Sequence, residues 1–287
     1  MAVAAVIGGS GRMGAWFANF LSSNGYEVII CDKNVTAARR MTRSKGFKFD
    51  PNPIRAAQVS EIVLFATPTL TTKSLLKKIT QQTARTTLLV EISSIKEPVR
   101  KTIENLNRRG ARIMSIHPMF GPGSNLMGKS IIIAQEPANC APARKLLSTF
   151  TKRGAKIIRS SLEDHDQLVA TTLALPHWMN FAFVETMKCT GLSLDKARDM
   201  GGTTFKLQLL IAEALYHESL HNEASILMDN KHNRKTLAYF TQQIKQLQRE
   251  TPTELLGRLR SDSAYVRKSK LFNRAHERFI AAVEASS

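Results

Sequence analysis

The chain has 287 residues, 43% of them hydrophobic, and carries 41 Lys and Arg against 23 Asp and Glu, a formal net charge of +18. This length and apolar content argue against disorder and provide a core that needs neither disulfides nor metals. The cysteines Cys31, Cys140 and Cys189 lie far apart and form no C-x-x-C. They support neither a disulfide framework nor a zinc ribbon, and a cytoplasmic location is expected.

The positive surplus is typical of proteins that bind nucleic acid, an anionic membrane surface or an anionic small molecule. The basic residues are spread along the chain in runs of at most two, without an aromatic and basic RNA-binding pattern. Nucleic acid is therefore not an expected partner. The apolar stretch from Leu173 to Val184 contains Pro176, His177 and Asn180 and is too short for a membrane span, so no membrane partner is expected.

The first half of the chain alternates short apolar runs with helical patterns. Most of the apolar runs are continuous, which is typical of strands buried on both faces of a parallel sheet. The first run follows Met1 directly, lacks the basic residues of a signal peptide and predicts a buried strand. The predicted strands are Val3–Ile7, Val28–Cys31, Ile62–Ala66, Leu88–Ile92, Ile113–His117, Ser130–Ala134 and Lys156–Ile158.

Helices are predicted between these strands, over Gly14–Ser23, from the cap Asn34 to Lys45, and over Lys96–Arg108. Repeated strand, helix, strand units predict an α/β fold with a doubly wound Rossmann domain over residues 1–160. From residue 161 the strand signals end and about five or six helices are predicted up to residue 287. Two capping boxes support them, Ser161 with Asp164 and Thr251 with Glu254.

A glycine-rich loop follows the first strand and opens the first helix. It reads G-x-G-x-x-G over Gly9, Ser10, Gly11, Arg12, Met13 and Gly14. In this position the glycines allow a pyrophosphate to approach the helix N-terminus. Asp32 ends the second strand, where a carboxylate binds both ribose hydroxyls and repels a 2′-phosphate, so the expected cofactor is NAD. Lys33 keeps NADP possible, and Thr67 with Pro68, after the strand Ile62–Ala66, complete the predicted cofactor site.

Two segments with reactive side chains follow later strands. Ser93, Ser94, Ile95 and Lys96 follow Leu88–Ile92, and the string from His117 to Pro122 follows Ile113–Ile116. In such sheets ligands bind at the carboxyl ends of the strands. A histidine there can take the proton of a hydroxyl while hydride leaves the same carbon, and Ser94 can hydrogen-bond that hydroxyl.

These motifs resemble those of the prephenate dehydrogenase family, the NAD-linked enzymes of tyrosine biosynthesis. The resemblance covers most of the chain and is strongest at Gly8–Gly14, at Ser94–Lys96 and in the string from His117 to Pro122. It implies that His117 is the catalytic hydrogen-bond acceptor and that Ser94 binds both the hydroxyl and the histidine. It also implies a helical C-terminal domain that forms a homodimer, and Lys96 is a candidate substrate-binding residue.

The implied reaction is the oxidation of the C4 hydroxyl of prephenate by hydride transfer to NAD, with loss of the ring carboxylate as CO₂. The implied substrate is thus a small dicarboxylate. His177 resembles a second family histidine that faces the substrate, although a core histidine is an equal alternative. Where the family often has a carboxylate-binding arginine after Gly-Gly, this chain has Lys206 after Gly201 and Gly202; Arg234 or a partner arginine is the alternative.

A further motif, H-E-x-x-H, occurs at His217, Glu218 and His221 and would bind zinc if it lay on one helix. No third ligand follows at the expected spacing, so no metal site is predicted and the two histidines are interpreted as solvated. His165, His232 and His276 lie in polar sequence and are also interpreted as solvated.

Other functions share these motifs. The chain could be an arogenate dehydrogenase, or a dehydrogenase of the same architecture that acts on a β-hydroxyacid or an imine. The net charge and Lys206 also fit a regulator that binds a dinucleotide without turning it over. The complete string from His117 to Pro122 favours the prephenate enzyme.

Overall fold

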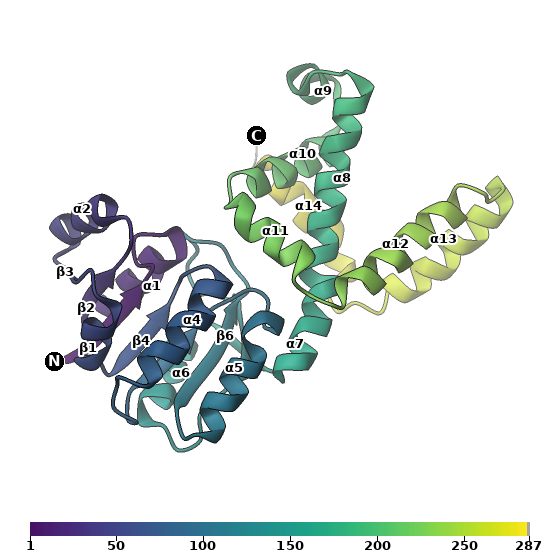
Figure 1. Cartoon of the computed structure of the whole chain (residues 1–287). Coiled ribbons are helices and arrows are strands. Elements are labelled where there is room, and N and C mark those ends of the chain that lie inside the picture. The colour runs from purple at the N-terminus through teal and green to yellow at the C-terminus, as the bar shows by residue number, and fades with distance from the viewer. Residues whose placement is uncertain (286–287) are drawn as a thin grey trace. The chain divides into compact units, whose positions relative to one another are not determined.

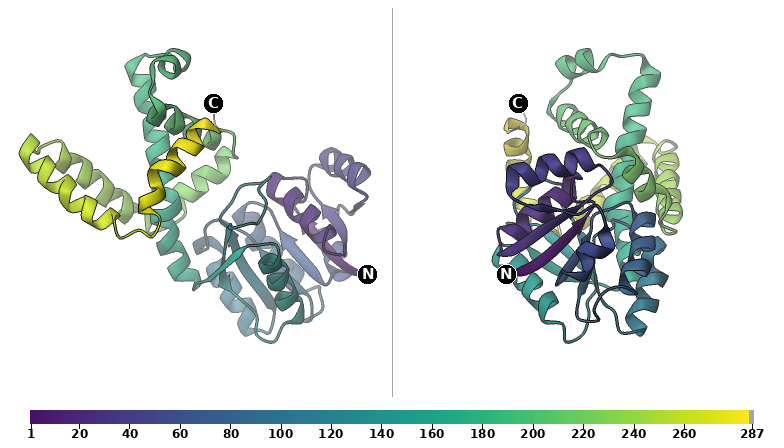
Figure 2. Two further views of the ribbon diagram at one scale, coloured as in Figure 1. Left: turned by 180° about the vertical axis from the view of Figure 1, so that it is seen from behind. Right: turned by 60° about the vertical axis from the view of Figure 1, so that its left-hand side comes forward.

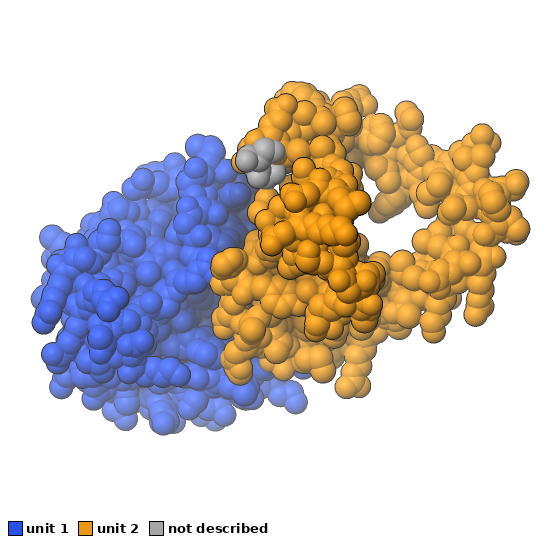
Figure 3. Space-filling view, turned by 90° about the horizontal axis from the view of Figure 1, so that it is seen from above, with its two compact units in different colours: residues 1–168 blue, residues 169–287 orange. Residues whose placement is uncertain are grey.

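A computed structural model describes residues 1–285 of the chain. It divides into two compact units, Met1–Leu168 and Val169–Ser287, which are coloured separately in Figure 3. The expected α/β domain followed by a helical region is confirmed. Within residues 1–285, no helix has the length and apolar character needed to cross a membrane.

Unit 1 is built around an eight-stranded sheet in the order β3-β2-β1-β4-β5-β6-β7-β8 (Figure 1). All neighbouring strands are parallel except β6 and β7, which are antiparallel. The continuous apolar runs had indicated a parallel sheet, so the prediction is wrong for the pair β6 and β7. The strands are β1 Ala2–Ile7, β2 Tyr26–Cys31, β3 Lys48–Phe49, β4 Ile62–Phe65, β5 Leu88–Glu91, β6 Arg112–Pro118, β7 Ser130–Gln135 and β8 Lys156–Arg159.

Helices cover both faces of this sheet because alternate residues of its strands point to opposite sides. Ala4 and Val6 of β1 face one apolar cluster with α1, α2 and α6, and Ala5 and Ile7 face a second cluster with α3, α4 and α5. Figures 1 and 2 show the helices on both sides of the strands. The helices of unit 1 are α1 Arg12–Ser22, α2 Val35–Lys45, α3 Pro53–Gln58, α4 Thr69–Thr80, α5 Glu97–Arg108, α6 Ala141–Lys152 and α7 Leu162–Val169.

The predicted caps explain several of these boundaries. Asn34 accepts the N–H of Ala37 at the start of α2, and Ser161 accepts the N–H of Asp164 at the start of α7. The expected domain boundary at 160/161 precedes α7, whereas the two units meet after Leu168. Helix α7, apart from its last residue Val169, lies with unit 1 because one of its faces is buried there, including His165 and Asp166.

Unit 2 is helical and contains more helices than the five or six expected. They are the π-helical turn Ala170–Ala174, α8 Leu175–Thr190, α9 Leu194–Met200, α10 Thr203–Tyr216, α11 Leu220–Met228, α12 Asn233–Leu247, α13 Pro252–Val266, the 3₁₀ turn Phe272–Arg274 and α14 Ala275–Glu284. Helices α12 and α13 run side by side as a projecting pair (Figures 1 and 2). The predicted capping box of Thr251 and Glu254 is confirmed at the start of α13.

Candidate active site

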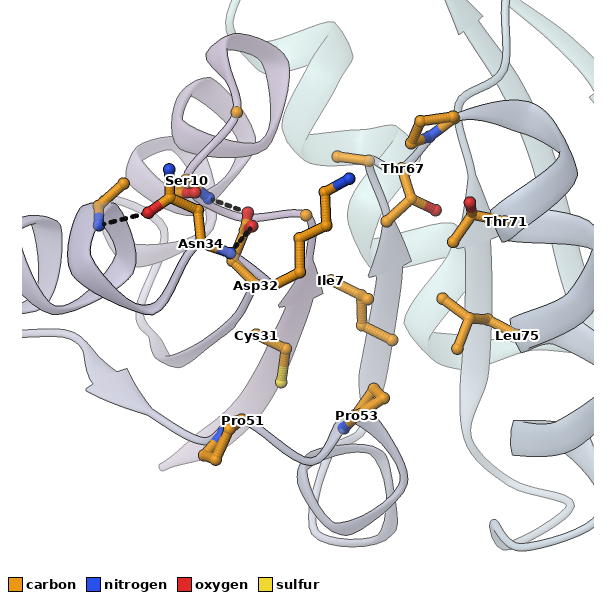
Figure 4. A pocket seen from close by; sticks show the side chains of 16 residues that line it. Ile7, Ser10, Cys31, Asp32, Asn34, Pro51, Pro53, Thr67, Thr71 and Leu75 are labelled. Carbon is orange, nitrogen blue, oxygen red and sulfur yellow. Dashed lines mark hydrogen bonds between the residues drawn. The ribbon is translucent and has the colours of Figure 1, made fainter.

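A cavity of about 540 Å³ lies in unit 1 at the carboxyl ends of β1, β2 and β4 (Figure 4). Ligands of doubly wound sheets bind at this edge. Among the predicted cofactor residues, the cavity is lined by Ser10, Gly11, Asp32, Thr67 and Pro68. The other predicted residues, Gly9, Arg12, Met13 and Gly14, belong to the loop and to the first turn of α1 but are not part of the lining.

The glycine loop has the shape that a dinucleotide needs. A Cβ on Gly14 would lie 2.1 Å from the carbonyl oxygen of Gly8, so glycine is required where α1 crosses the loop. Gly11 is the N-cap of α1, and no side chain caps this helix. The uncapped N–H groups and the positive end of the helix dipole are suited to a pyrophosphate.

Asp32 lies at the edge of the same cavity. Its Oδ2 accepts the N–H of Ser10 and its Oδ1 accepts the N–H of Asn34, both at 3.0 Å (Figure 4). Each carboxylate oxygen can accept a further hydrogen bond, so Asp32 retains capacity for ribose hydroxyls. The neighbouring Cys31 remains a thiol, because burial, with Asp50 and Asp32 nearby, raises its pKa to about 12. The residues present therefore fit a dinucleotide.

His117 lies near the carboxyl end of β6, with 5% of its surface exposed. Its Nδ1 is 2.9 Å from Nε2 of His165, and the two ring centroids are 5.1 Å apart. Burial, and next to it the neighbouring His165 and Lys96 side chains, hold the pKa of His117 well below its usual value. The ring is therefore neutral at neutral pH, and a bare ring nitrogen can accept a hydrogen bond.

The interpretation of His165 as a solvated residue is wrong. Its side chain is fully buried, its Nδ1 lies 2.8 Å from Oδ1 of Asp166, and burial lowers its pKa. The sequence contains one signal that points to this placement. Leu162, His165, Asp166 and Val169 are spaced as one face of a helix, and all four are buried, so the two polar residues occupy the inner face of α7.

Lys96 lies in the interior of unit 1 rather than at an open substrate surface. Its ammonium donates to Glu91 Oε1 at 2.7 Å and to the carbonyl of Ile116 at 2.8 Å. Glu91 also accepts the Ser115 hydroxyl and the N–H of Ser93. Burial lowers the pKa of Lys96, and Glu91 opposes this effect. Lys96 thus ties β5, β6 and the start of α5 together beside His117, in place of the expected substrate contact.

The serines between β5 and α5 differ from expectation. Within residues 1–285, Ser94 forms no side-chain hydrogen bond, and Nδ1 of His117 is bonded to His165 instead. The neighbouring Ser93 hydroxyl is buried without a partner among the same residues. A buried hydroxyl without a partner is rare and marks a candidate contact for a ligand or ordered water.

In unit 2, His177 lies on α8 and its Nδ1 is 2.5 Å from Oε2 of the buried Glu223 on α11. The carboxylate fixes which ring nitrogen carries the proton. Lys206 lies exposed in the first turn of α10, and Arg234 lines a groove along α12. The structure therefore assigns neither basic residue to a carboxylate.

The H-E-x-x-H motif does not lie on one helix, as its zinc interpretation requires. His217 is the C-cap of α10, and Ser219 caps α11, on which His221 lies. The helix break separates the two histidines. In the part of the chain that the structure describes, no group of three or more His, Cys, Asp and Glu side chains is arranged to hold a metal ion.

The sheet order, the glycine loop and the acidic residue after β2 define unit 1 as a Rossmann-type dinucleotide-binding domain. Residues 17–137 match the family described as "Prephenate dehydrogenase, nucleotide-binding domain", and residues 161–260 match "Prephenate dehydrogenase, dimerization domain". The chain belongs to the prephenate dehydrogenase family.

Curated relatives are named for two substrates. A "Probable arogenate/prephenate dehydrogenase" of Methanocaldococcus jannaschii is 26% identical over 84% of this chain and 55% of its own length. The "T-protein" of Haemophilus influenzae is 24% identical over 79% of this chain and 56% of its own length. The chain thus spans about half the length of these two relatives.

Solved structures share the fold. The prephenate dehydrogenase of Aquifex aeolicus in complex with hydroxyphenyl propionate and NAD⁺ superposes with a TM-score of 0.76 at 22% identity, covering 92% of this chain and 97% of that one. The arogenate dehydrogenase of Synechocystis gives 0.70 at 19% identity, covering 93% and 99%.

Proposed function

We propose that the chain is an NAD-dependent prephenate dehydrogenase that converts prephenate to 4-hydroxyphenylpyruvate and CO₂ in tyrosine biosynthesis. The observation that carries the proposal is the buried His117 at the carboxyl edge of the sheet that bears the dinucleotide cavity. Family membership and the names of the relatives support the substrate class.

Each part of unit 1 has a role in this proposal. The glycine loop and the start of α1 hold the pyrophosphate, and Asp32 binds the ribose hydroxyls and favours NAD over NADP. When bound, the nicotinamide accepts the hydride. His117 accepts the hydrogen bond of the substrate hydroxyl on the carbon that loses this hydride. Aromatisation of the ring accompanies the loss of CO₂, so the protein mainly positions the substrate and polarises its hydroxyl.

The test is to incubate the protein with prephenate and NAD and to follow NADH absorbance. His117→Asn should lower kcat about 10²- to 10⁴-fold, because the proton acceptor is removed. His276→Asn, an exposed histidine of α14, is the matched control and should keep full activity. Unchanged turnover in His117→Asn would contradict the assignment. Arogenate and a panel of β-hydroxyacids and imines are run in parallel, and the substrate with the highest kcat/KM defines the enzyme.

A homodimer formed through unit 2 is part of the proposal. The family match of residues 161–260 carries the word dimerization, and many large apolar side chains of unit 2 are exposed. A cytoplasmic location is also proposed, and the three free cysteines support it. Light scattering of the purified chain at several concentrations measures the oligomeric state, and a monomer throughout would refute the dimer.

A further inference from the structure

Three side chains of unit 1 form a continuous hydrogen-bonded line that ends at His117. Asp166 Oδ1 lies 2.8 Å from Nδ1 of His165, and Nε2 of His165 lies 2.9 Å from Nδ1 of His117. His165 and Asp166 come from α7, whereas His117 comes from β6, 48 residues earlier than His165. His165 is fully buried and Asp166 nearly so, so water does not compete for these bonds.

Asp166 determines which atoms donate and which accept in this series of hydrogen bonds. Its Oδ1 also accepts the N–H of Lys96 at 2.9 Å, and its Oδ2 accepts the N–H of Glu97 at 2.7 Å, both at the start of α5. An ionised carboxylate accepts hydrogen bonds and donates none. Nδ1 of His165 must therefore carry the ring proton and donate a hydrogen bond to Asp166.

The remaining protons follow from the neutrality of both rings. A neutral imidazole has one N–H and one bare nitrogen, so His165 with a proton on Nδ1 offers a bare Nε2. That nitrogen accepts a hydrogen bond from Nδ1 of His117. His117 then has its own proton on Nδ1, and its Nε2 carries the free lone pair. Within residues 1–285 this Nε2 has no hydrogen-bond partner.

We propose that His165, backed by Asp166, is a positioning residue that holds His117 in the Nδ1–H tautomer, so that Nε2 is the atom that accepts the substrate hydroxyl. The catalytic part of this inference rests on the proposed function. The tautomer itself does not, because it is a property of the protein without substrate.

A histidine bonded to Nδ1 of His117 affects the charge of that ring differently from a carboxylate in the same place. A carboxylate beside His117 would stabilise an imidazolium. The neutral His165 fixes the same tautomer without that charge, and the buried ammonium of Lys96 disfavours a second positive charge nearby. The arrangement thus keeps His117 available as an acceptor over the neutral pH range.

The direct test is ¹⁵N NMR of the histidine-labelled protein without substrate at about neutral pH. His117→Asn identifies the His117 signals by their disappearance. We expect the shifts of a protonated Nδ1 and a bare Nε2. An Nε2–H tautomer or an imidazolium at His117 would overturn the inference, whatever the activity of the enzyme.

Two variants test the role of His165. His165→Leu removes the acceptor, so the His117 tautomer should change and kcat should fall about 10²-fold or more, with a smaller effect on KM. His165→Gln supplies a side-chain carbonyl in place of Nε2 and should restore the Nδ1–H signal and most of kcat. His276→Leu is the control for labelling and activity. Asp166 is avoided because it also caps α5.

The outcomes separate the two proposals. A wild-type Nδ1–H tautomer that changes in His165→Leu together with a fall in kcat supports the inference, and an unchanged tautomer or unchanged kcat refutes it. If His165→Leu does not fold, the wild-type spectrum and His165→Gln decide. If the wild type has the expected tautomer but turns over none of the tested substrates, the proposed function fails while the assignment of the tautomer stands.

Discussion

The two units of the chain differ in how completely they enclose their apolar side chains. In unit 1, both faces of the sheet are covered, and the buried side chains form two extended clusters. Unit 2 buries few apolar side chains, namely Val169, Ala170, Ala174, Ala197, Leu209, Ala212 and Ile226. Large side chains of α13 such as Leu256, Leu259 and Tyr265 are exposed instead.

This difference follows from the elements themselves. A parallel sheet gains both of its covering layers from the helices that connect its own strands. The long helices of unit 2 have apolar side chains that the unit itself does not cover, and exposed apolar surface of this kind marks an interaction site. Unit 1 should therefore owe its stability to its own core, whereas the stability of unit 2 should depend on the second subunit of the proposed homodimer.

The largest expected change in the free energy of unfolding comes from Gly14 in unit 1, which is compared with Gly257 in unit 2. Gly14→Ala should lower the free energy of unfolding by about 3 kcal/mol or more, since its Cβ would lie 2.1 Å from the carbonyl oxygen of Gly8. Gly257→Ala is the matched control on α13, where a Cβ meets no atom within 4 Å, and it should stabilise by about 0.5–1 kcal/mol. Urea unfolding measures both, and equal effects would contradict the comparison.

Two leucines compare the cores of the units. Leu88→Ala, at a fully buried position of β5, should cost about 2–5 kcal/mol at any protein concentration. Leu256 is 49% exposed, so Leu256→Ala should have little effect on a monomer. If α13 contributes to the dimer, Leu256→Ala should raise the dimer dissociation constant and make the melting temperature more dependent on concentration. An equal loss of stability in both variants, independent of protein concentration, would contradict the expected difference between the two units.

A smaller change in the free energy of unfolding is expected when the pH is lowered, and it comes from two histidines of unit 1. The folded-state pKa values of His117 and His165 are lowered by burial, with Lys96 adding to the effect and Asp166 and Glu91 opposing it at His165. Below about pH 6.5 the unfolded chain therefore binds more protons than the folded one, and the free energy of unfolding falls by up to about 1.4 kcal/mol per pH unit for each histidine. His165→Gln should reduce this slope, and a slope unchanged by the substitution would contradict the assignment.

The sequence predicted the parts of unit 1 that depend on neighbouring residues. Seven strands lie where the apolar runs indicated, and the caps at Asn34 and Ser161 are present. The two-residue strand β3 was not predicted, since Lys48 and Phe49 give too short a pattern to recognise. The antiparallel pairing of β6 and β7 also escaped, because hydropathy does not report strand direction.

The candidate site was harder to predict, since it depends on contacts between distant residues. The glycine loop, Asp32 and His117 were predicted from local motifs, and the structure places Ser10, Gly11 and Asp32 at the cavity and His117 near the end of β6. His165 and Glu91 were missed because polar side chains become buried only when distant partners satisfy them, and those partners cannot be read from spacing. Lys96 was assigned to substrate for the same reason, because the buried Glu91 that holds it was not recognised.

Asp166 links the start of α5 to the hydrogen bonds that hold His117, the proposed acceptor of the substrate hydroxyl. The same carboxylate accepts hydrogen bonds from the backbone N–H groups of Lys96 and Glu97 at the start of α5 and from Nδ1 of His165. Any fluctuation that frays the first turn of α5 therefore also weakens the hydrogen bonds from Asp166 through His165 to His117. Under the proposed mechanism, turnover therefore reports on local order at that turn, and a partly unfolded unit 1 would lose its activity before it lost its sheet.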